Sequence, residues 1–153
     1  MLFLLALCLS AIAGDLQVHV LDVGQGDAIL LEASNGKRVL VDAGTKGSGV
    51  TQQLQARGIK TLDLVVATHA HADHIGGMAE VLSTFQPKLY VDNSMPHSTL
   101  TYSRTMSAVE RHELGYRAAA LGRVFNVDKD VKLTILHPGT RLLRGTRSDL
   151  NSN

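Results

Sequence analysis

The residues best suited to chemistry in this chain are three histidines and one aspartate within six positions, His69-Ala70-His71-Ala72-Asp73-His74. Imidazole nitrogens and carboxylate oxygens bind zinc, and they also suit manganese or iron. The cluster follows the apolar run at 62–67, so a buried strand would end in a loop that delivers all four side chains to one cleft. Ordinary surface histidines are the alternative, but clustered ones indicate a metal site.

The spacing of these residues predicts two pairs of metal ligands. In an extended loop, His69, His71 and Asp73 alternate in register and point the same way. His74 points elsewhere unless the backbone turns, and the Gly76-Gly77 pair can supply that turn. The loop could then present His69 with His71, and Asp73 with His74, to two neighbouring metals that share a bridging hydroxide as nucleophile. We therefore expect Asp73 to be catalytic, holding one metal and orienting the attacking water.

The pattern H-x-H-x-D-H followed by Gly-Gly resembles the main metal loop of the metallo-β-lactamase superfamily. The upstream segment 37–44 is similar to that family's strand ending in an Asp-x-Gly turn. The resemblance implies that Asp42 supports the metal ligands from behind, as carboxylates often do for ligating histidines; a simple turn aspartate is the alternative. It also implies an α/β fold, the αββα sandwich, and a divalent metal cofactor. We expect two zinc ions, with manganese or iron as alternatives.

A third segment, 18–28, is similar to the opening strand and loop of the hydrolase domain of ComEC-type DNA-uptake competence proteins and their secreted relatives. The segments 92–97, 101–102 and 145–151 also look like those relatives, so the resemblance runs from about residue 16 to the last. It implies metal-dependent hydrolysis of phosphodiester bonds, with DNA or another nucleic acid as partner. The candidate substrate contacts are Asp22, Gln25, Asp27 and His97.

The family domain consists of two similar halves, and this sequence matches the first. The family's later Gly-Asp turn and later histidine pair have no match here, so we expect a C-terminally truncated domain at 14–153, with the missing half in a longer protein. Four donors shared by two metals leave each short, because a catalytic zinc keeps three protein ligands. A non-catalytic remnant or metal-binding module, or a hydrolase of lactone, thioester or lactam substrates, are the alternative functions. The weaker ligand candidates are His19, His97, His112 and His137.

Composition agrees with one small folded domain. The 153 residues are 44% hydrophobic and 19% charged, which favours a core over disorder, and with 4% aromatics that core must be aliphatic. The net charge is +1, but from Pro87 onward ten Lys and Arg face six Asp and Glu, against five and eight before it. A basic second portion could favour an anionic substrate; an ordinary mixed surface is the alternative.

The first thirteen residues form an apolar segment that is too short to span a membrane stably. Ala11-Ile12-Ala13 before Gly14 fits the cleavage rule of a secretory signal peptide at 1–13. We expect export to the periplasm or the exterior, with an uncleaved N-terminal anchor as the alternative. Cys8 is the chain's one cysteine, so the mature domain would have no disulfide.

Periodicity and turn residues predict a mixed sheet with outer helices. We expect strands at 16–21, 28–33, 37–41, 62–67, 88–91 and 131–136, and helices at 50–57, 78–85 and 102–114. The second and third strands would form a hairpin around Ser34-Asn35-Gly36. A hairpin followed by strand–helix–strand units indicates a sheet with antiparallel and parallel parts.

Overall fold

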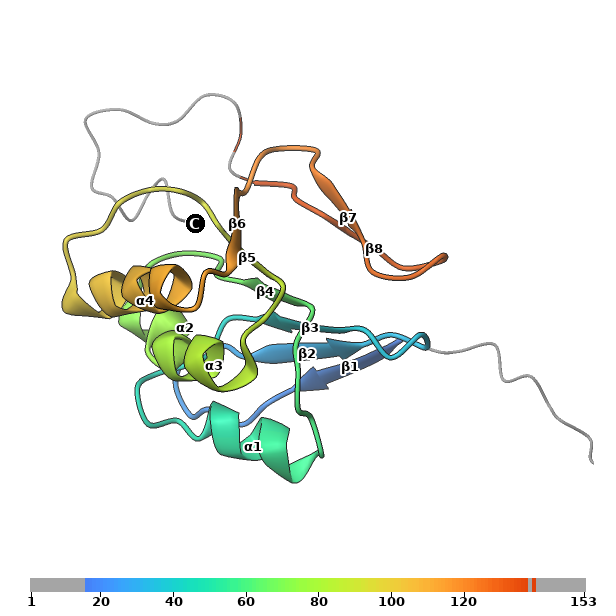
Figure 1. The fold of residues 1–153 in the computed structure, drawn as a ribbon, viewed down its shortest axis with the longest axis horizontal. Helices are drawn as coiled ribbons and strands as arrows, with labels where there is room; N and C mark the ends of the chain where they lie inside the picture. The colour runs from blue at the N-terminus through green and yellow to red at the C-terminus, as the bar shows by residue number, and fades with distance from the viewer. Residues whose placement is uncertain (1–15, 138, 140–153) are drawn as a thin grey trace, which may run out of the picture.

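The computed structural model describes residues 16–137 and 139, which form an α/β fold (Figure 1). The predicted signal peptide at 1–13 and the segment at 145–151 lie outside the described residues. No helix among the residues described is both long and apolar enough to cross a membrane. The strands are β1 (Gln17–Val20), β2 (Ile29–Glu32), β3 (Arg38–Val41), β4 (Leu64–Val66), β5 (Leu89–Asp92), β6 (Gly115–Ala118), β7 (Val124–Asn126) and β8 (Lys132–Thr134). The helices are α1 (Val50–Ala56), α2 (Ala72–Ile75), α3 (Met78–Phe85) and α4 (Leu100–Arg111).

The strands β1 to β6 form one sheet in the order of the sequence. β1, β2 and β3 pair antiparallel, whereas β3 to β6 run parallel. Each parallel step needs a crossover connection, and helices supply it: α1 between β3 and β4, α2 and α3 between β4 and β5, and α4 between β5 and β6. This mixed sheet with helices on an outer face confirms the predicted fold class.

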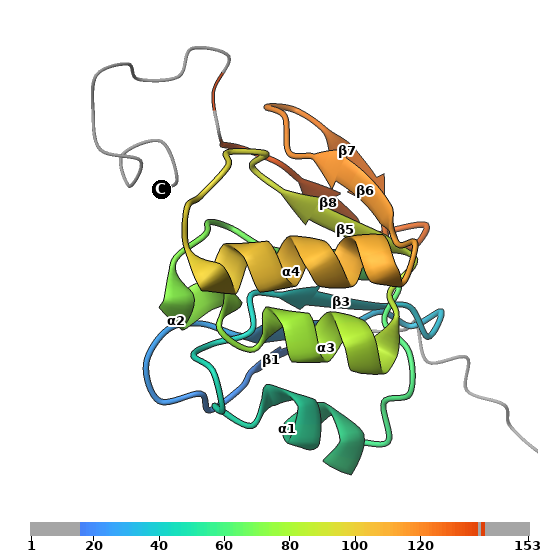
Figure 2. The ribbon, with the colours of Figure 1, turned by 60° about the vertical axis from the view of Figure 1, so that its left-hand side comes forward.

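Two aliphatic cores lie on opposite faces of the sheet. On one face, α1, α3 and α4 pack against fully buried strand residues such as Leu40 and Val65. On the other face, Phe125 of β7 packs toward a cluster that includes Val39 and Val91. Figure 2 shows the helices in front of the sheet and the β7–β8 hairpin beyond it. Strands covered on both faces carry continuous apolar runs, which explains the uniformly apolar sequence of β4.

The turn between β2 and β3 is tied to the β7–β8 hairpin. The Ser34 hydroxyl donates to Asp128 Oδ2 (2.7 Å), and the backbone N–H of Asn35 donates to the same oxygen (3.1 Å). The side-chain amide of Asn35 donates to the Val127 carbonyl (3.0 Å). The antiparallel pairing of β2 with β3 confirms the predicted hairpin around Ser34-Asn35-Gly36. The hydrogen bonds of its turn also hold the β7–β8 hairpin, which covers the second face of the sheet.

The candidate functional residues gather at the end of the sheet where the parallel strands have their carboxyl ends. β3, β4 and β5 are parallel, so their carboxyl ends meet there. β3 is followed at once by Asp42, β4 leads within two residues to Thr68 and the histidine loop, and β5 ends in Asp92. Val20 of β1 lies in register with the start of β2 and the end of β3. The 21–28 loop therefore opens at the same end of the sheet (Figure 1).

The sequence predicts no elements at β6, β7 or α2, and it is wrong there. β6 and β7 alternate between exposed and half-buried residues at the margins of the fold, so they lack a buried apolar run. α2 is a single turn, too short to show a helical period. The strand predicted at 131–136 is shorter and pairs with β7 in a separate two-stranded sheet.

The outer strand β1 exposes apolar side chains on the face opposite the helices. Val18 is 57% exposed and Val20 is 75% exposed. The two side chains point to the same side because strand residues alternate, and their cross-strand neighbours Leu31 and Ile29 are half-buried. An apolar strand at the edge of a sheet favours pairing with another chain.

We expect the purified chain to self-associate as its concentration rises, and Val20→Lys to reduce that association by placing a charge on the edge strand. Sedimentation velocity across a concentration series measures the effect, and circular dichroism checks the fold. Leu121→Lys is the matched control, because Leu121 is 52% exposed but lies outside β1. A wild-type chain that stays monomeric throughout would contradict the prediction.

Candidate metal centre

Close backbone packing holds the histidine loop against its neighbours. Gly26 has φ 88, and a Cβ built there would lie 1.7 Å from the Asp73 carbonyl oxygen. A Cβ at Gly76 would lie 2.3 Å from the Lys46 amide nitrogen. Only glycine permits such approaches. The two loops that press on α2 therefore do so because no side chain separates the backbones.

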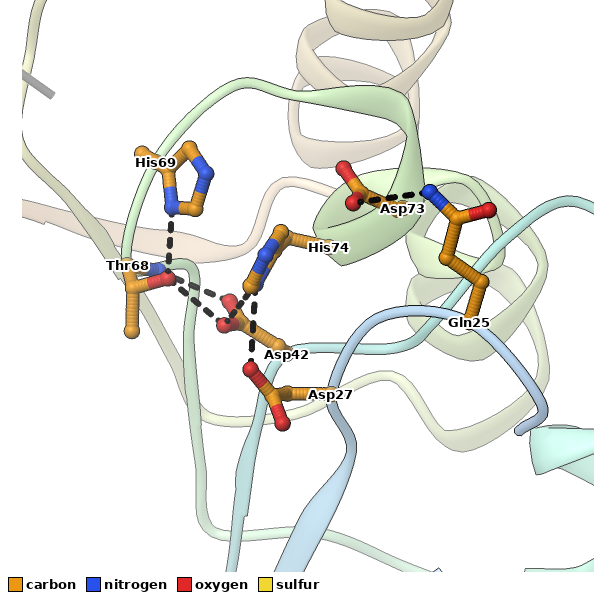
Figure 3. Close-up of polar contacts among 7 residues, drawn as sticks. All are labelled: Gln25, Asp27, Asp42, Thr68, His69, Asp73 and His74. Carbon is orange, nitrogen blue, oxygen red and sulfur yellow. Dashed lines mark hydrogen bonds and ion pairs between the residues drawn. The ribbon is translucent and has the colours of Figure 1, made fainter. Parts of the chain in front are cut away.

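The centre is organised around one buried carboxylate, that of Asp42 (Figure 3). Asp42 directly follows β3, is 1% exposed, and has φ 58, a left-handed conformation that Asp tolerates better than most residues. Its Oδ1 accepts from the Thr68 N–H (2.8 Å), and its Oδ2 accepts from the Thr68 hydroxyl (2.6 Å). His74 Nδ1 lies 2.8 Å from the same Oδ2. Asp42 thus contacts one of the candidate ligands, and its role in supporting metal ligation stays a prediction.

These hydrogen bonds fix the proton positions on two imidazoles. A carboxylate can only accept, so His74 Nδ1 donates to Asp42. The single hydroxyl proton of Thr68 goes to Asp42, so His69 Nδ1, 3.0 Å from the Thr68 oxygen, donates to that oxygen. Both rings therefore carry their proton on Nδ1 and keep the lone pair on Nε2. That is the form in which histidine binds a metal through Nε2.

Burial acts on the charges of this cluster. Desolvation raises the pKa of Asp42, and the hydrogen bonds from Thr68 and His74 partly oppose that rise. Desolvation lowers the pKa of His69, as does the proximity of His74 and His71, while Asp42 and Asp73 act in the opposite direction. The net effect keeps His69 neutral to lower pH, and neutral imidazole is the metal-binding form.

The rings of the three histidines lie close together at the carboxyl end of the parallel strands. The ring of His69 is 4.0 Å from that of His74 and 4.6 Å from that of His71, measured between centroids. The predicted extended alternation from 69 to 73 is wrong at its end, because α2 begins at Ala72. One helical turn, closed by the His74 N–H to the His71 carbonyl (3.0 Å), returns His74 to the side of His69.

One group of three donors is tightly gathered. Asp27, Asp42 and His74 each offer a ligand atom within 4.8 Å of the others. Among the described residues, His69, His71 and Asp73 do not belong to this group. The nitrogen and oxygen donors of the whole set fit a divalent metal by their chemistry. The ligand roles of His69, His71, Asp73 and His74 stay a prediction, and so does zinc.

The candidate substrate contacts separate into two groups. Gln25 Nε2 lies 3.5 Å from Asp73 Oδ2, and Asp27 Oδ2 lies 3.8 Å from His74 Nδ1, so this pair joins the centre (Figure 3). The ring of His97 lies 6.2 Å from that of His71, at the margin. Asp22 instead accepts from the Gly24 N–H and shapes its own loop.

The remaining histidines lie apart from the centre. His19 is on β1, 3.5 Å from Glu32 Oε1. His112 caps the C-terminus of α4, and His137 is an exposed residue after β8. No contact described for these residues links them to the histidine loop.

Sequence reasoning misses Thr68 and a polar cluster behind His69. Asp92 is 4% exposed and accepts from the Tyr116 hydroxyl (2.8 Å) and the Ser94 N–H (2.7 Å). Its Oδ2, like Asn93 Nδ2, is buried without a hydrogen-bond partner among the described residues. Both side chains belong to residues that line a narrow recess with His69. A threonine before the first histidine, and a polar pair ending the next strand, were the available signals.

The comparison with protein families agrees with this geometry. The family model described as the metallo-beta-lactamase superfamily matches residues 21–142. The ComE operon protein 3 of Bacillus subtilis is 28% identical over 141 residues, covering 80% of this chain and 18% of that protein. Ribonuclease Z of Clostridioides difficile is 43% identical over 49 residues, covering 32% of this chain and 16% of the enzyme.

Solved structures show the same fold. The subclass B3 metallo-beta-lactamase MEM-A1, from a soil metagenome library, superposes with a TM-score of 0.54 at 17% identity. The match covers 79% of this chain and 48% of that structure. The chain therefore spans about half of this structure and less than a fifth of the two curated relatives.

Replacing Thr68 with Val removes the hydroxyl that joins Asp42 to His69 while keeping the backbone bond to Oδ1. We expect zinc affinity to fall by about 10- to 100-fold, the usual effect of losing a group that orients a ligating histidine. Competition with a chromophoric chelator measures the affinity. Thr84→Val, at an exposed position of α3, is the matched control; equal affinity in both variants would contradict the expectation.

The lowered pKa of His69 predicts that acid destabilises the metal-free protein. In the unfolded chain His69 takes up a proton near pH 6.5, whereas in the folded chain it does so only at lower pH. The free energy of unfolding therefore decreases as the pH falls below about 6.5. Chemical denaturation from pH 7.5 to 5 should show a shallower loss in His69→Gln than in the wild type. His137→Gln, an exposed histidine, serves as control and should keep the wild-type slope.

Proposed function

This chain belongs to the metallo-beta-lactamase superfamily, and on that basis we propose that it carries the metal centre of a hydrolase that cleaves phosphodiester bonds of nucleic acid. One observation carries the metal part of the proposal: the hydrogen bonds from Asp42 and Thr68 fix the Nδ1 protons of His74 and His69. They leave two Nε2 atoms ready to bind metal. Partners that fix the tautomer are typical of histidines that bind a metal. Packing alone does not require that two histidines have a fixed tautomer.

We place the metals on the Nε2 side of His69 and His74, with His71 and Asp73 as further ligands. Asp42 and Asp27 both face Nδ1 of His74, at 2.8 Å and 3.8 Å. A cation between them would have to displace the proton that His74 gives to Asp42. The carboxylate of Asp42 therefore orients the ring from behind rather than binding the metal itself.

Divalent metals at this position would lower the pKa of water and polarise the substrate oxygen. The protein's own groups supply orientation. Gln25 Nε2 lies 3.5 Å from Asp73 Oδ2, where a weak hydrogen bond would help Asp73 to orient the attacking water. His69 and Asp92 are both buried and line one narrow recess beside the centre.

The choice of a phosphodiester substrate is supported by resemblance. The Asp22–Asp27 loop is similar to that of competence hydrolase domains, and the match to the ComE operon protein 3 extends over most of the chain. Shorter matches link part of the chain to proteins named ribonuclease Z. These similarities favour nucleic acid over lactams, lactones and thioesters, which the metal loop alone does not distinguish.

A metal-binding module without catalysis is the second candidate. The observation that favours it is the donor count: among the described residues, the tight three-donor group is Asp27, Asp42 and His74, two of which face the same nitrogen. Such a chain would bind one metal and hydrolyse nothing by itself.

Metal content and turnover test both candidates. We expect purified wild-type chain to bind zinc, His71→Ala to lose at least half of it, and His137→Ala to keep it. Inductively coupled plasma mass spectrometry gives the stoichiometry per chain. Equal zinc in His71→Ala and the wild type would remove the metal proposal.

For activity, we expect nicking of supercoiled plasmid and hydrolysis of bis-p-nitrophenyl phosphate that stop with EDTA and return with metal. A chromogenic lactam, a thioester and a homoserine lactone are the competing substrates. Turnover of one of these in place of the diesters would overturn the substrate assignment. Metal binding without any turnover would favour the module.

A further inference from the structure

A second hollow, of about 210 Å³, opens on the helical side of the histidine loop. Its floor includes Ile75 and Gly76, which directly follow the candidate ligand His74. Its rim includes Lys46 from the loop after β3, Glu80 of α3, and Thr101 and Arg104 of α4. The hollow thus lies where the loop after β3 and the helices α2, α3 and α4 meet, beside the metal centre.

The charges at this rim are not neutralised within the described part of the chain. Lys46, Arg104 and Glu80 are all exposed, and none of them takes part in an ion pair between described residues. Two cations and one anion leave a net positive charge around a concave surface. An oxyanion is the ligand that such a surface attracts, since Arg offers a planar fork and Lys a compact charge.

The hollow is rigidly connected to the histidine loop. The Lys46 backbone lies so close to Gly76 that a Cβ on Gly76 would meet the Lys46 nitrogen at 2.3 Å. Ile75 is 1% exposed and lines both this hollow and the recess beside His69. A group bound at Lys46 and Arg104 would therefore lie close beside the candidate metal ligands.

Resting on the proposed function, we propose that Lys46 and Arg104 form a subsite for a second phosphate of the nucleic-acid strand, next to the one that is cleaved. A strand carries one phosphate per nucleotide, so a strand held at the metal centre presents further phosphates along its path. Phosphate contacts of this kind position a strand without reading its sequence. Thr101 adds a hydroxyl to the same rim, and Glu80 opposes binding by its charge.

The test measures binding separately from hydrolysis. The metal-free full chain is titrated into a fluorescein-labelled single-stranded oligonucleotide in EDTA, and fluorescence anisotropy gives Kd over a range of salt concentrations. Lys46→Ala and Arg104→Ala should each weaken binding several-fold and reduce the slope of log K against log salt by about 0.7 per lost phosphate contact. Glu80→Gln should strengthen binding.

Arg111→Ala is the matched control, because Arg111 is an exposed arginine in the last turn of the same helix, outside the hollow. An equal loss of affinity in Arg111→Ala, weaker binding in Glu80→Gln, or no oligonucleotide binding by the wild type would each overturn the subsite.

Hydrolysis of bis-p-nitrophenyl phosphate, which has a single phosphate, distinguishes this result from the proposed function. If the subsite exists, Lys46→Ala and Arg104→Ala should keep wild-type turnover of this small diester while KM for the oligonucleotide rises. Unchanged oligonucleotide KM with active enzyme would reject the subsite alone. Loss of all diester hydrolysis in the wild type, with the binding differences intact, would reject the proposed function alone.

Discussion

The candidate metal centre at the carboxyl end of the parallel strands depends on one buried hydrogen-bond acceptor, the carboxylate of Asp42. A carboxylate that is 1% exposed is stable only when its oxygens are hydrogen-bonded. Thr68 and His74 supply those hydrogen bonds, with donor–acceptor distances of 2.6–2.8 Å. The residue that follows β3 is thereby joined to the segment that follows β4 and to α2. Removing the carboxylate would leave three donors without their acceptor, and leaving buried donors unpaired costs about 1–3 kcal/mol each.

The same constraint explains why glycines surround the centre. The hydrogen bonds of Asp42 require α2 to lie directly against the turn after β3, and the 21–28 loop must then close over α2. A Cβ at Gly26 would overlap the Asp73 carbonyl, and one at Gly76 would overlap the Lys46 backbone. Side-chain hydrogen bonding and backbone contact therefore depend on each other. The left-handed φ of Asp42 is maintained because both hold it in place.

Much of the scaffold could be predicted from the sequence, because its cues are local and strong. The Asn-Gly turn marks the β2–β3 hairpin, the apolar run marks β4, and Gly58 follows the end of the helix predicted at 50–57. The site was only partly predictable. His69, His71 and His74 share a short motif, but the helical turn that begins at Ala72 reflects packing of α2 against distant loops. The role of Thr68 depends on Asp42, 26 positions earlier, so a threonine next to the first histidine signals a polar residue near the site but not its partner.

The histidine loop and the charged residues around the neighbouring hollow differ in how strongly the fold constrains them. The histidine loop is fixed by backbone contacts and by buried hydrogen bonds, so its donors have little freedom to change. The side chains of Lys46, Arg104 and Glu80 are exposed and take no part in these hydrogen bonds, although they lie beside the centre. A scaffold of this kind can keep one set of metal-binding groups while exposed neighbours alter which substrate is held. If the proposed subsite is correct, discrimination among substrates belongs to the rim, where a change of charge would alter binding without disturbing Asp42 and the residues hydrogen-bonded to it.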